Sequence, residues 1–343
     1  MLKFFMKNMI VVGGLVSLMS CGRENDRIEP VISPLPIDSV TMLSPITELI
    51  NADELIKDSV WKDGINHTVQ IKIGPKFVLH SLSKEKIFPG AIVSNSKLLA
   101  IEWQNNYFEY QPVVLSIADI GSEEFNPSYE NFISVINYYK AKNTKPFISA
   151  SIDGEGRAFS TYSDLVLVNG YKKQPVENWL TINNRQSKRR KTGIVYLFKT
   201  VDCSVSIGVP RKGQLIDKEK YAQQIEADTL SYVNQIDIGK RGVLTFMCDA
   251  AYDVAQAIIV KLRKGESLSL EEQKVLQDGE IGYFLQGYQD AKIPTTNNAE
   301  IVKEVYNTIR TTTSLGDPIA FFVRGVKDLS PYKGVAQIDI IRQ

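Results

Sequence analysis

Apolar residues recur at every second position of residues 249–263, and this stretch constrains the fold more than any other. Only Gln256 interrupts the alternation. A period of two predicts a strand with one apolar face. A tilted strand of roughly 10 residues can cross a bilayer, but most strands of this length lie in ordinary sheets. Taken alone, the pattern predicts a sheet and says nothing of membranes. The apolar face consists of Tyr252, Val254, Ile258, Val260 and Leu262.

A short polar helix is expected directly after this strand. The strand should break at Gly265, and helical spacing begins at Ser269. Ser269 and Glu272 have the spacing of a capping box, and Gly279 supplies a stop. The sequence therefore predicts a long strand that leads into a capped helix.

A second junction of helix and strand is expected earlier in the chain. Residues 128–139 have helical spacing, and alternation follows at residues 146–152 and 158–168 around a turn at residues 153–156. One face of the helix would carry Phe132, Val135, Ile136 and Tyr139.

The first 21 residues have the pattern of a signal peptide and not of a spanning helix: two lysines precede an apolar run. Their end, LMSCG, resembles the lipobox of bacterial lipoproteins, in which the cysteine, here Cys21, is acylated and becomes the first mature residue. The alternative is an ordinary secretory leader with an incidental cysteine. Residues 22–45 are proline-rich and predict a flexible tether, so we expect folding to begin near Ile46.

Composition argues against nucleic acid and metal as partners. Forty basic and 39 acidic residues give a formal net charge of +1, so no overall field attracts a polyanion. The basic run at residues 187–191 has no interleaved aromatic residues, which favours a solvated loop over an anion-binding site. His67 and His80 lack a cysteine or carboxylate at ligand spacing, so packed or surface histidines are favoured over metal ligands.

The cysteines and serines do not predict catalysis either. Cys203 and Cys248 could form a disulfide in an oxidising compartment, but two free thiols are favoured. Neither cysteine neighbours a histidine, and no Gly-x-Ser-x-Gly motif occurs. We therefore expect no catalytic residue, no metal, no cofactor and no enzymatic activity.

Local signals place further elements. Asn51 has the character of a helix cap before residues 52–56, and residues 67–73 alternate like a strand. Three more strands are expected at residues 91–93, 98–103 and 112–117.

An ordered series of landmarks resembles the thiol-activated, cholesterol-dependent cytolysins, within the perforin-like (MACPF/CDC) superfamily. Phe-Pro-Gly-Ala at residues 88–91 is similar to the family's Tyr-Pro-Gly-Ala, and residues 112–117 to the strand after it. Asn-Pro-Ser-Tyr at residues 126–129 resembles the Asp-Pro-Thr-Tyr that opens the first membrane-insertion segment. Residues 194–210 are similar to the family strand YKQIFYTVSADLP.

The later landmarks keep the family's order. Residues 251–262 resemble NVAYGRTIYVKLE, the strand that enters the second insertion segment. Residues 284–288 are similar to the Val-Val-Leu-Gly-Gly strand, and residues 317–320 to Tyr-Pro-Ile-Ser. The resemblance extends from about residue 51 to residue 343.

The resemblance implies an α+β fold, a bent and twisted antiparallel sheet flanked by two helical clusters that can unfold into amphipathic β-hairpins. Together with the leader and the proline-rich stretch, it divides the chain into a lipoprotein signal peptide (1–21), a tether (22–45) and a cytolysin-like region (46–343), whose pore-forming core is expected at about 126–170 and 240–315. Residues 251–262 would contribute the apolar face named above to the second hairpin. The candidate insertion residues of the first segment are Tyr129, Phe132, Val135, Ile136, Ile148, Ala150 and Ile152.

Two departures from the family limit the expected function. The family ends in a domain with a tryptophan-rich loop that recognises cholesterol, and this sequence reaches Gln343 without a counterpart, so we expect that domain to be missing. The three tryptophans are scattered. Gly287 and Tyr288 replace the family's paired glycines, which leaves Gly287 as the candidate hinge for strand opening.

Two hypotheses follow. The first is an exported pore-forming lipoprotein, anchored to a bacterial outer membrane or cell surface through Cys21. Its partners would be a lipid membrane and either copies of itself or a longer cytolysin-like subunit. The alternative is a surface-anchored binding lipoprotein that keeps the fold without forming pores. An exported enzyme is the least favoured class.

Overall fold

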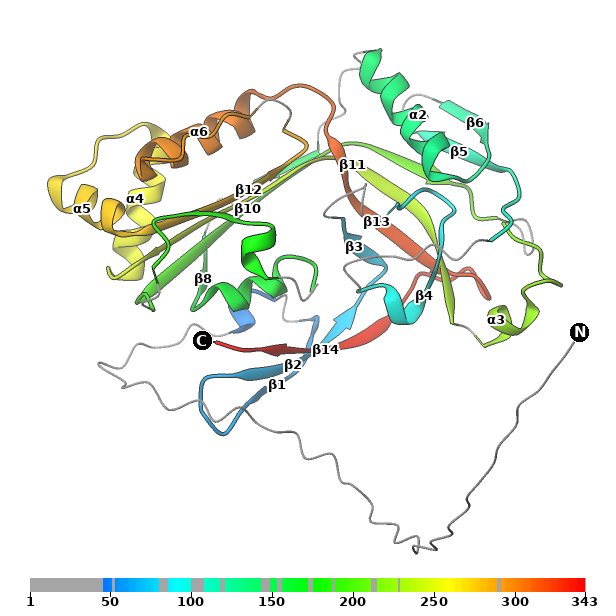
Figure 1. Cartoon of the computed structure of the whole chain (residues 1–343), viewed down its shortest axis with the longest axis horizontal. Helices are drawn as coiled ribbons and strands as arrows, with labels where there is room; N and C mark the ends of the chain where they lie inside the picture. Colours follow the sequence, from blue (N-terminus) through cyan, green and yellow to red (C-terminus); the bar gives the residue numbers. More distant parts are fainter. Residues whose placement is uncertain are drawn as a thin grey trace, which may run out of the picture. The chain divides into compact units, whose positions relative to one another are not determined.

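Long antiparallel strands form the centre of the structure, a computed structural model (Figure 1). All described elements belong to one unit, Thr41–Gln343. The structure describes residues 46–50, 53–79, 86–99, 108–117, 121–142, 149–152, 156–171, 175–186, 189–210, 215–227, 229–288 and 291–342.

The two central strands are β10 (Thr192–Ile207) and β11 (Leu230–Cys248), which pair along most of their length with a bulge between Val201 and Cys203. Both are rich in β-branched and aromatic residues, which suit a sheet covered on two faces. The other edge of β11 pairs first with β13 (Asp317–Gly325) and then with β12 (Glu280–Gln286).

Three glycines lie where β11 changes partner from β13 to β12. A Cβ atom at Gly239 would lie 1.9 Å from the carbonyl oxygen of Thr200, and one at Gly316 would lie 1.8 Å from that of Gly239. Gly287 adopts a φ of +81°, a conformation that L residues rarely adopt. Larger residues would therefore separate these strands.

Shorter strands complete the larger sheet. The second edge of β10 pairs with β5 (Val113–Ile117), β7 (Ser149–Ile152) and β8 (Arg157–Phe159), and β6 (Gly121–Phe125) lies outside β5. Three further strands pair with β13, β11 and β12 respectively. They are β3 (Lys76–Val78), β4 (Ile92–Ser94) and β9 (Thr181–Asn183).

A separate three-stranded sheet has the order β1 (Leu55–Val60), β2 (His67–Ile73) and β14 (Gly334–Ile340). Alternate residues of β2 are buried, as the period of two predicts. Buried residues of this sheet belong to the same hydrophobic cluster as much of the larger sheet, so the two sheets share one core.

Helices α4 (Tyr252–Lys264), α5 (Leu270–Asp278) and α6 (Asn298–Thr311) lie together against β10, β11 and β12 (Figure 1). They form a second hydrophobic cluster with one face of these strands. The other helices are α2 (Tyr129–Ala141), α3 (Ala222–Glu226) and the 3-10 helices η1 (Ile46–Glu48), η2 (Asn95–Lys97), η3 (Tyr162–Leu167) and η4 (Val176–Asn178). Among the described residues, no helix is both long and apolar enough to span a bilayer.

Most of the predicted elements are confirmed, including the strands at residues 67–73, 91–93 and 112–117. The helix expected after Asn51 is wrong in its described part, because residues 53 and 54 lie in a turn and strand β1 begins at Leu55. Residues 158–168 are a strand only as far as Phe159 and then form η3. Leu98 and Leu99 lie in a turn, and the rest of the strand expected at 98–103 lies outside the described residues.

Candidate functional site

Two connections between strands meet at one end of the central sheet. The first connection, residues 160–191, leads from β8 to β10, and the second connection, residues 249–279, leads from β11 to β12. β8 pairs with the first residues of β10. The first residues of β10 also pair with the last residues of β11, and the last residues of β11 pair with the first residues of β12. Both connections therefore start and finish at the same edge of the sheet.

Helix α4 occupies the stretch whose alternation predicted a strand, and that prediction is wrong. The strand that enters the second connection is β11, which ends at Cys248. Residues 251–262 follow this strand, so their match to the family's entering strand is also wrong. The same residues also contain a helical stripe at i, i+3, i+4 and i+7. Its four members are buried: Ala255, Ile258, Ile259 and Leu262.

Burial of this stripe explains why the helix forms. The stripe packs into the cluster that contains Ile194 and Phe246 of the sheet, and each buried aliphatic side chain contributes about 1.5–3 kcal/mol. Gly265 ends the helix in a left-handed conformation, with a φ of +76°. Basic residues occupy the last turn, where they interact favourably with the helix dipole.

The predicted capping box of α5 is confirmed. The backbone N–H of Glu272 donates to Ser269 Oγ at 3.2 Å, and the backbone N–H of Ser269 donates to Glu272 Oε2 at 2.8 Å. Lys261 of α4 forms an ion pair with Glu272 Oε1 at 2.7 Å. This ion pair and the backbone hydrogen bond from Ser269 lower the pKa of Glu272. The two helices are thus joined to each other as well as to the sheet.

The first connection is built from 3-10 turns and one short strand. Leu165 of η3 and Leu180 after η4 are buried. Strand β9 pairs with Ile281, Gly282 and Tyr283 on the outer edge of β12. An unpaired edge of this kind is a template for another strand, so β9 covers part of a potential pairing surface.

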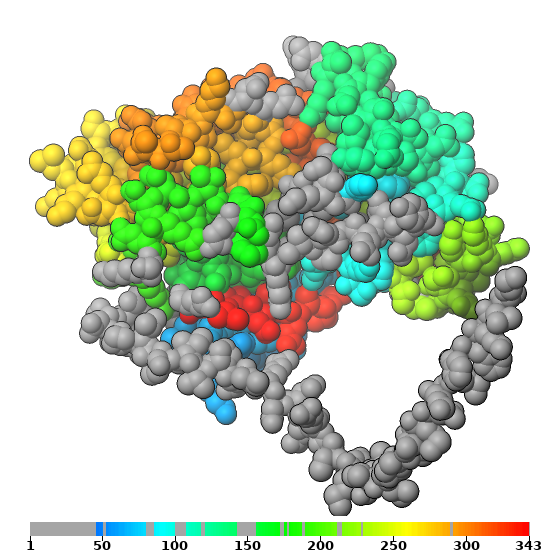
Figure 2. All heavy atoms as spheres, viewed as in Figure 1, coloured from blue at the N-terminus to red at the C-terminus, as the bar shows by residue number. Residues whose placement is uncertain are grey.

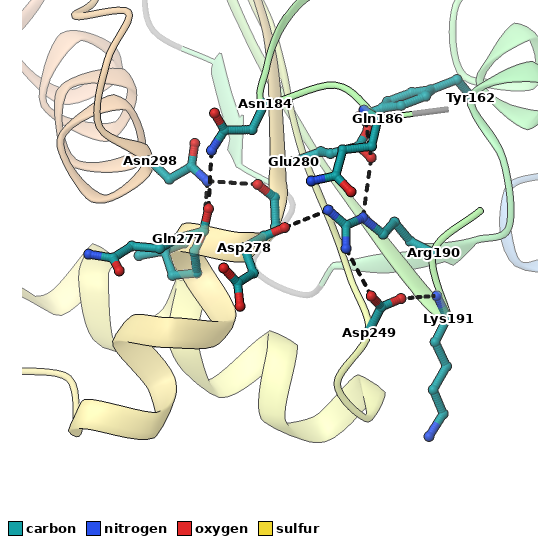
Figure 3. A network of polar contacts seen from close by, with 12 residues as sticks. Tyr162, Asn184, Gln186, Arg190, Lys191, Asp249, Gln277, Asp278, Glu280 and Asn298 are labelled. Carbon is teal, nitrogen blue, oxygen red and sulfur yellow. Dashed lines mark hydrogen bonds and ion pairs between the residues drawn. The ribbon is translucent and has the colours of Figure 1, made fainter. Parts of the chain in front are cut away.

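A polar cluster joins the two connections, and Figure 3 shows it from close by. The side chain of Arg190 is 5% exposed, and its guanidinium contacts Asp249 at 2.8 Å and Glu280 at 3.3 Å. It also donates to the backbone carbonyl of Asp278. The expectation that residues 187–191 form a solvated loop is therefore wrong for Arg190. Its guanidinium joins the end of the first connection to Asp249 and Asp278, at the two ends of the second connection.

Further hydrogen bonds extend this cluster (Figure 3). Asn184 of the first connection donates to the carbonyl of Gln277 in α5 at 3.1 Å. Asn298 of α6 donates to the carbonyls of Leu276 and Gly279. Burial and the nearby Glu280 carboxylate raise the pKa of Tyr162, so its hydroxyl stays protonated and donates to Glu280.

The candidate insertion residues of the second segment fall in α4. Ile258 and Leu262 are buried, Tyr252 and Val260 are half-buried, and Val254 is 39% exposed. Tyr252 donates to the carbonyl of Gly156, at the start of β8, at 2.6 Å. Their role in insertion stays a prediction.

The candidates of the first segment divide between two elements. Helix α2 carries Phe132 and Ile136, which are buried in the larger cluster. Its Tyr129 and Val135 pack partly buried against the same cluster. Strand β7 carries Ala150 and Ile152, paired with β10, and Ile148 lies outside the described residues.

Sequence reasoning missed much of the first connection, because the expected core ended at about residue 170. The signal present was Thr-x-x-Asp at residues 161–164, which has the spacing of a capping motif. It marks the start of η3, and the backbone N–H groups of Ser160 and Thr161 both donate to Asp164.

Gly287 directly follows β12. Its φ is +81°, and a Cβ atom there would lie 2.3 Å from the carbonyl oxygen of Gly239. The backbone of β12 therefore turns sharply and packs tightly at this point, and the role of Gly287 as a hinge stays a prediction.

Cys203 and Cys248 are free thiols. Cys248 pairs with Thr192, whereas Cys203 pairs with Ile238, ten residues away along β11 (238 to 248), which corresponds to about 34 Å. No disulfide can join them in this fold. Burial raises the pKa of Cys203 to about 11, which makes it a poor nucleophile.

His67 is a packed side chain whose Nδ1 lies 2.9 Å from Asp58 Oδ1. His80 lies outside the described residues. In the described part of the chain, no three His, Cys, Asp or Glu side chains lie close enough together to hold a metal ion.

Comparison with known proteins identifies the architecture. No protein-family model and no curated protein matches the sequence. Among solved structures, a non-haemolytic pneumolysin from Streptococcus pneumoniae matches with a TM-score of 0.61 and 16% identity over 88% of this chain and 73% of that chain. Suilysin from Streptococcus suis matches with a TM-score of 0.57 and 16% identity, over 85% and 69% respectively.

The human-specific toxin intermedilysin matches with a TM-score of 0.55 and 16% identity, over 83% of this chain and 68% of that chain. The expected α+β fold is confirmed by these matches and by the mixture of helices and antiparallel sheet. The chain therefore shares the fold of these toxins, as its resemblance to the cholesterol-dependent cytolysins led us to expect.

Proposed function

We propose that this protein is a pore-forming lipoprotein whose two connections refold into β-hairpins when several copies assemble on a membrane. The observation that carries the proposal is the double pattern of α4. As a helix it buries Ala255, Ile258, Ile259 and Leu262, and as a strand residues 252–262 would present an alternating face that Gln256 interrupts and that consists of Tyr252, Val254, Ile258, Val260 and Leu262.

The placement of the connections supports the proposal. Each one joins two paired strands of the central sheet, β8 and β10 for the first and β11 and β12 for the second, so an extended connection would lengthen the existing sheet by a hairpin. A spanning strand in lipid must have all of its backbone groups paired, which requires a closed barrel. One chain cannot close such a barrel with two hairpins, so assembly of many copies is part of the proposal.

Assembly needs free strand edges. On the side of β12, strand β9 covers residues 281–283, so a neighbouring copy could pair there only after β9 has moved. The first connection would therefore have two roles. It would supply one hairpin, and its strand β9 would cover the edge of β12 with which a neighbouring copy pairs.

Charge distribution sets a condition on the refolded state. Lys261 and Arg263 would share the face opposite the apolar one, and they must face the lumen, because a basic residue facing lipid at the midplane costs about 2–4 kcal/mol. Arg157, at the start of β8, must likewise lie in the lumen or near an interface.

The proposal includes export and a lipid anchor. The leader and the lipobox that ends at Cys21 support acylation at this residue and attachment to a bacterial outer membrane or cell surface. Targeting would depend on this anchor or on a longer cytolysin-like partner that carries a receptor-binding domain. The proposal contains no catalytic step.

Dye release tests the proposal. Residues 22–343 would be added to dye-loaded vesicles of phosphatidylcholine with and without cholesterol, and of phosphatidylethanolamine with phosphatidylglycerol. The proposal predicts release together with rings by electron microscopy. A complete lack of both, with the protein alone, with the lipidated chain and with a longer cytolysin-like partner added, would refute it.

The second candidate is a surface-anchored binding lipoprotein without pore formation. It is favoured by one finding: a similar structure belongs to a pneumolysin described as non-haemolytic, so this fold does not by itself require lysis. In this case the protein would bind vesicles or another partner and release no dye.

A further inference from the structure

Three basic side chains and one carboxylate lie close together on one face of the central sheet. Lys76 of β3 donates from Nζ to Asp237 Oδ2 of β11 at 2.9 Å, and Nζ of Lys199 on β10 lies 3.9 Å from the same oxygen. Arg241 is directly opposite Lys199 in the pairing of β10 with β11, so their side chains share a face. Three positive charges therefore lie near one negative charge.

The carboxylate in this cluster already has a full set of donors. The side chain of Asp237 is 5% exposed, and its Oδ1 accepts from Ser204 Oγ and from Gln235 Nε2, each at 2.9 Å. Its Oδ2 accepts from Lys76, whereas 3.9 Å is too long for a hydrogen bond from Lys199. Asp237 therefore forms a hydrogen-bonded ion pair with Lys76 and not with Lys199.

Two other charged groups of the neighbouring strands have partners of their own. Strand β13, which lies between β3 and β11, contains one acidic residue, Asp317, and its Oδ1 accepts from Lys140 of α2 at 2.7 Å. The guanidinium of Arg241 donates to Asn169 Oδ1 at 3.1 Å. Asn169 belongs to the first connection, which Figure 2 shows in green on the surface of the molecule. Arg241 therefore acts on Lys199 through its charge.

This arrangement of cations is unfavourable for the sheet itself. Like charges directly opposite each other on antiparallel strands are destabilising, and Lys199 is in the interior of the sheet, because Ser151 of β7 pairs with its other side. Burial and the nearby Lys76 ammonium lower the pKa of Lys199 to about 8, so its surroundings disfavour the positive charge. Violations of local rules of this kind are typical of functional sites.

The two lysines are open to a ligand from the solvent. The side chains of Lys76 and Lys199 are 40% and 36% exposed. Both ammonium nitrogens lie within 4 Å of one oxygen atom, at 2.9 and 3.9 Å, so at most about 7 Å separates them. One tetrahedral anion can then accept from both at the usual distance of about 2.8 Å. An excess of two positive charges, three against one, matches a dianion.

We propose that Lys76 and Lys199 bind the phosphate group of a ligand, which is either inorganic phosphate or the headgroup of a phospholipid. Asp237 positions Lys76, and Arg241 adds positive charge to the site. The inference does not depend on pore formation, because the site belongs to the folded chain and involves no refolding.

Isothermal titration calorimetry of residues 22–343 with inorganic phosphate tests the site. At pH 7 and low salt we expect saturable binding of one phosphate, and a loss of affinity of about tenfold or more in Lys76→Gln and in Lys199→Gln. The matched control is Lys303→Gln, at an exposed position of α6, which should leave the affinity unchanged. Circular dichroism would show that each variant is folded.

A second measurement separates a ligand site from a merely structural cluster. A bound anion favours the charged form of Lys199 and raises its pKa, so binding at pH 8 should take up protons. Calorimetry in buffers of different ionisation enthalpy measures this uptake, which Lys199→Gln should abolish. Asp237→Asn, if folded, should bind phosphate several-fold more tightly than the wild type, because it removes the competing carboxylate. Weaker binding by the folded variant would contradict the inference.

Flotation with vesicles of phosphatidylcholine, with and without phosphatidic acid, identifies the source of the phosphate group. A headgroup ligand predicts that phosphatidic acid increases binding of the wild type and that Lys199→Gln abolishes the increase. A free ligand predicts that both proteins bind both vesicles equally, while only the wild type binds inorganic phosphate tightly in solution. The inference is overturned if Lys199→Gln changes neither the binding of inorganic phosphate nor that of the vesicles.

Discussion

The first and second connections occupy equivalent places at one end of the central sheet, but different interactions hold them. The second connection rests on an apolar stripe of α4 in a separate hydrophobic cluster. The described part of the first connection is held by buried charges, Asp164 with Arg342 and Arg190 with Glu280, as well as by buried leucines. Apolar burial tolerates sliding and repacking, whereas a buried ion pair is either made or broken. If the connections refold as proposed, release of the first connection would require these buried ion pairs to break.

Removal of the charge at Arg190 should have the largest effect on stability. Arg190→Gln leaves Glu280, whose side chain is 3% exposed, without its cation, and we expect a loss of roughly 3–5 kcal/mol in the free energy of unfolding. Urea unfolding followed by circular dichroism measures this loss. A change below about 1 kcal/mol would show that the cluster between the connections behaves like an exposed ion pair.

Truncation of the α4 stripe should have the next largest effect. Ile258→Ala removes a fully buried side chain and should cost about 2–5 kcal/mol, with faster exchange confined to α4 and α5. Val254→Ala is the matched control, because Val254 is 39% exposed and its truncation should change stability by about 0.5 kcal/mol or less. Equal effects of the two substitutions would contradict the helical packing of α4.

Acid should weaken the link between α4 and α5 slightly. The lowered pKa of Glu272 means that its contribution is complete above the ordinary glutamate pKa, and it is lost as the pH falls through the lowered value. Glu272→Gln keeps a residue that can complete the capping box but removes the ion pair with Lys261. The protection of α5, which is its exchange rate relative to the intrinsic rate at the same pH, should therefore stop depending on pH below about pH 4.5 in this variant. A dependence that persists would assign it to another group.

The sequence predicted elements whose signals are local. The helix at residues 128–139 and the capping box at Ser269 follow from periodicity and caps, whereas the long strand β10 is expected only from the resemblance of residues 194–210 to a family strand. Residues 249–263 have apolar residues at both helical and strand spacing. The helix forms because its apolar stripe is buried against Ile194 and Phe246, a contact that no local pattern predicts. The pairing of β9 with β12 and of Arg342 with Asp164 joins residues about 100 or more positions apart, so only the folded chain reveals it.

A reversible cross-link between β9 and β12 tests the central claim most directly. Thr181 and Tyr283 are paired across these strands, at a separation that suits a disulfide. The control bridge joins Ser116 and Ser122, whose hydroxyls lie 3.0 Å apart on β5 and β6, where no opening is required. Mass spectrometry would confirm both bridges. The account predicts that oxidised Thr181→Cys/Tyr283→Cys releases no dye, that reduction restores release, and that oxidised Ser116→Cys/Ser122→Cys releases dye like the wild type. Undiminished release by the oxidised β9–β12 bridge would contradict it.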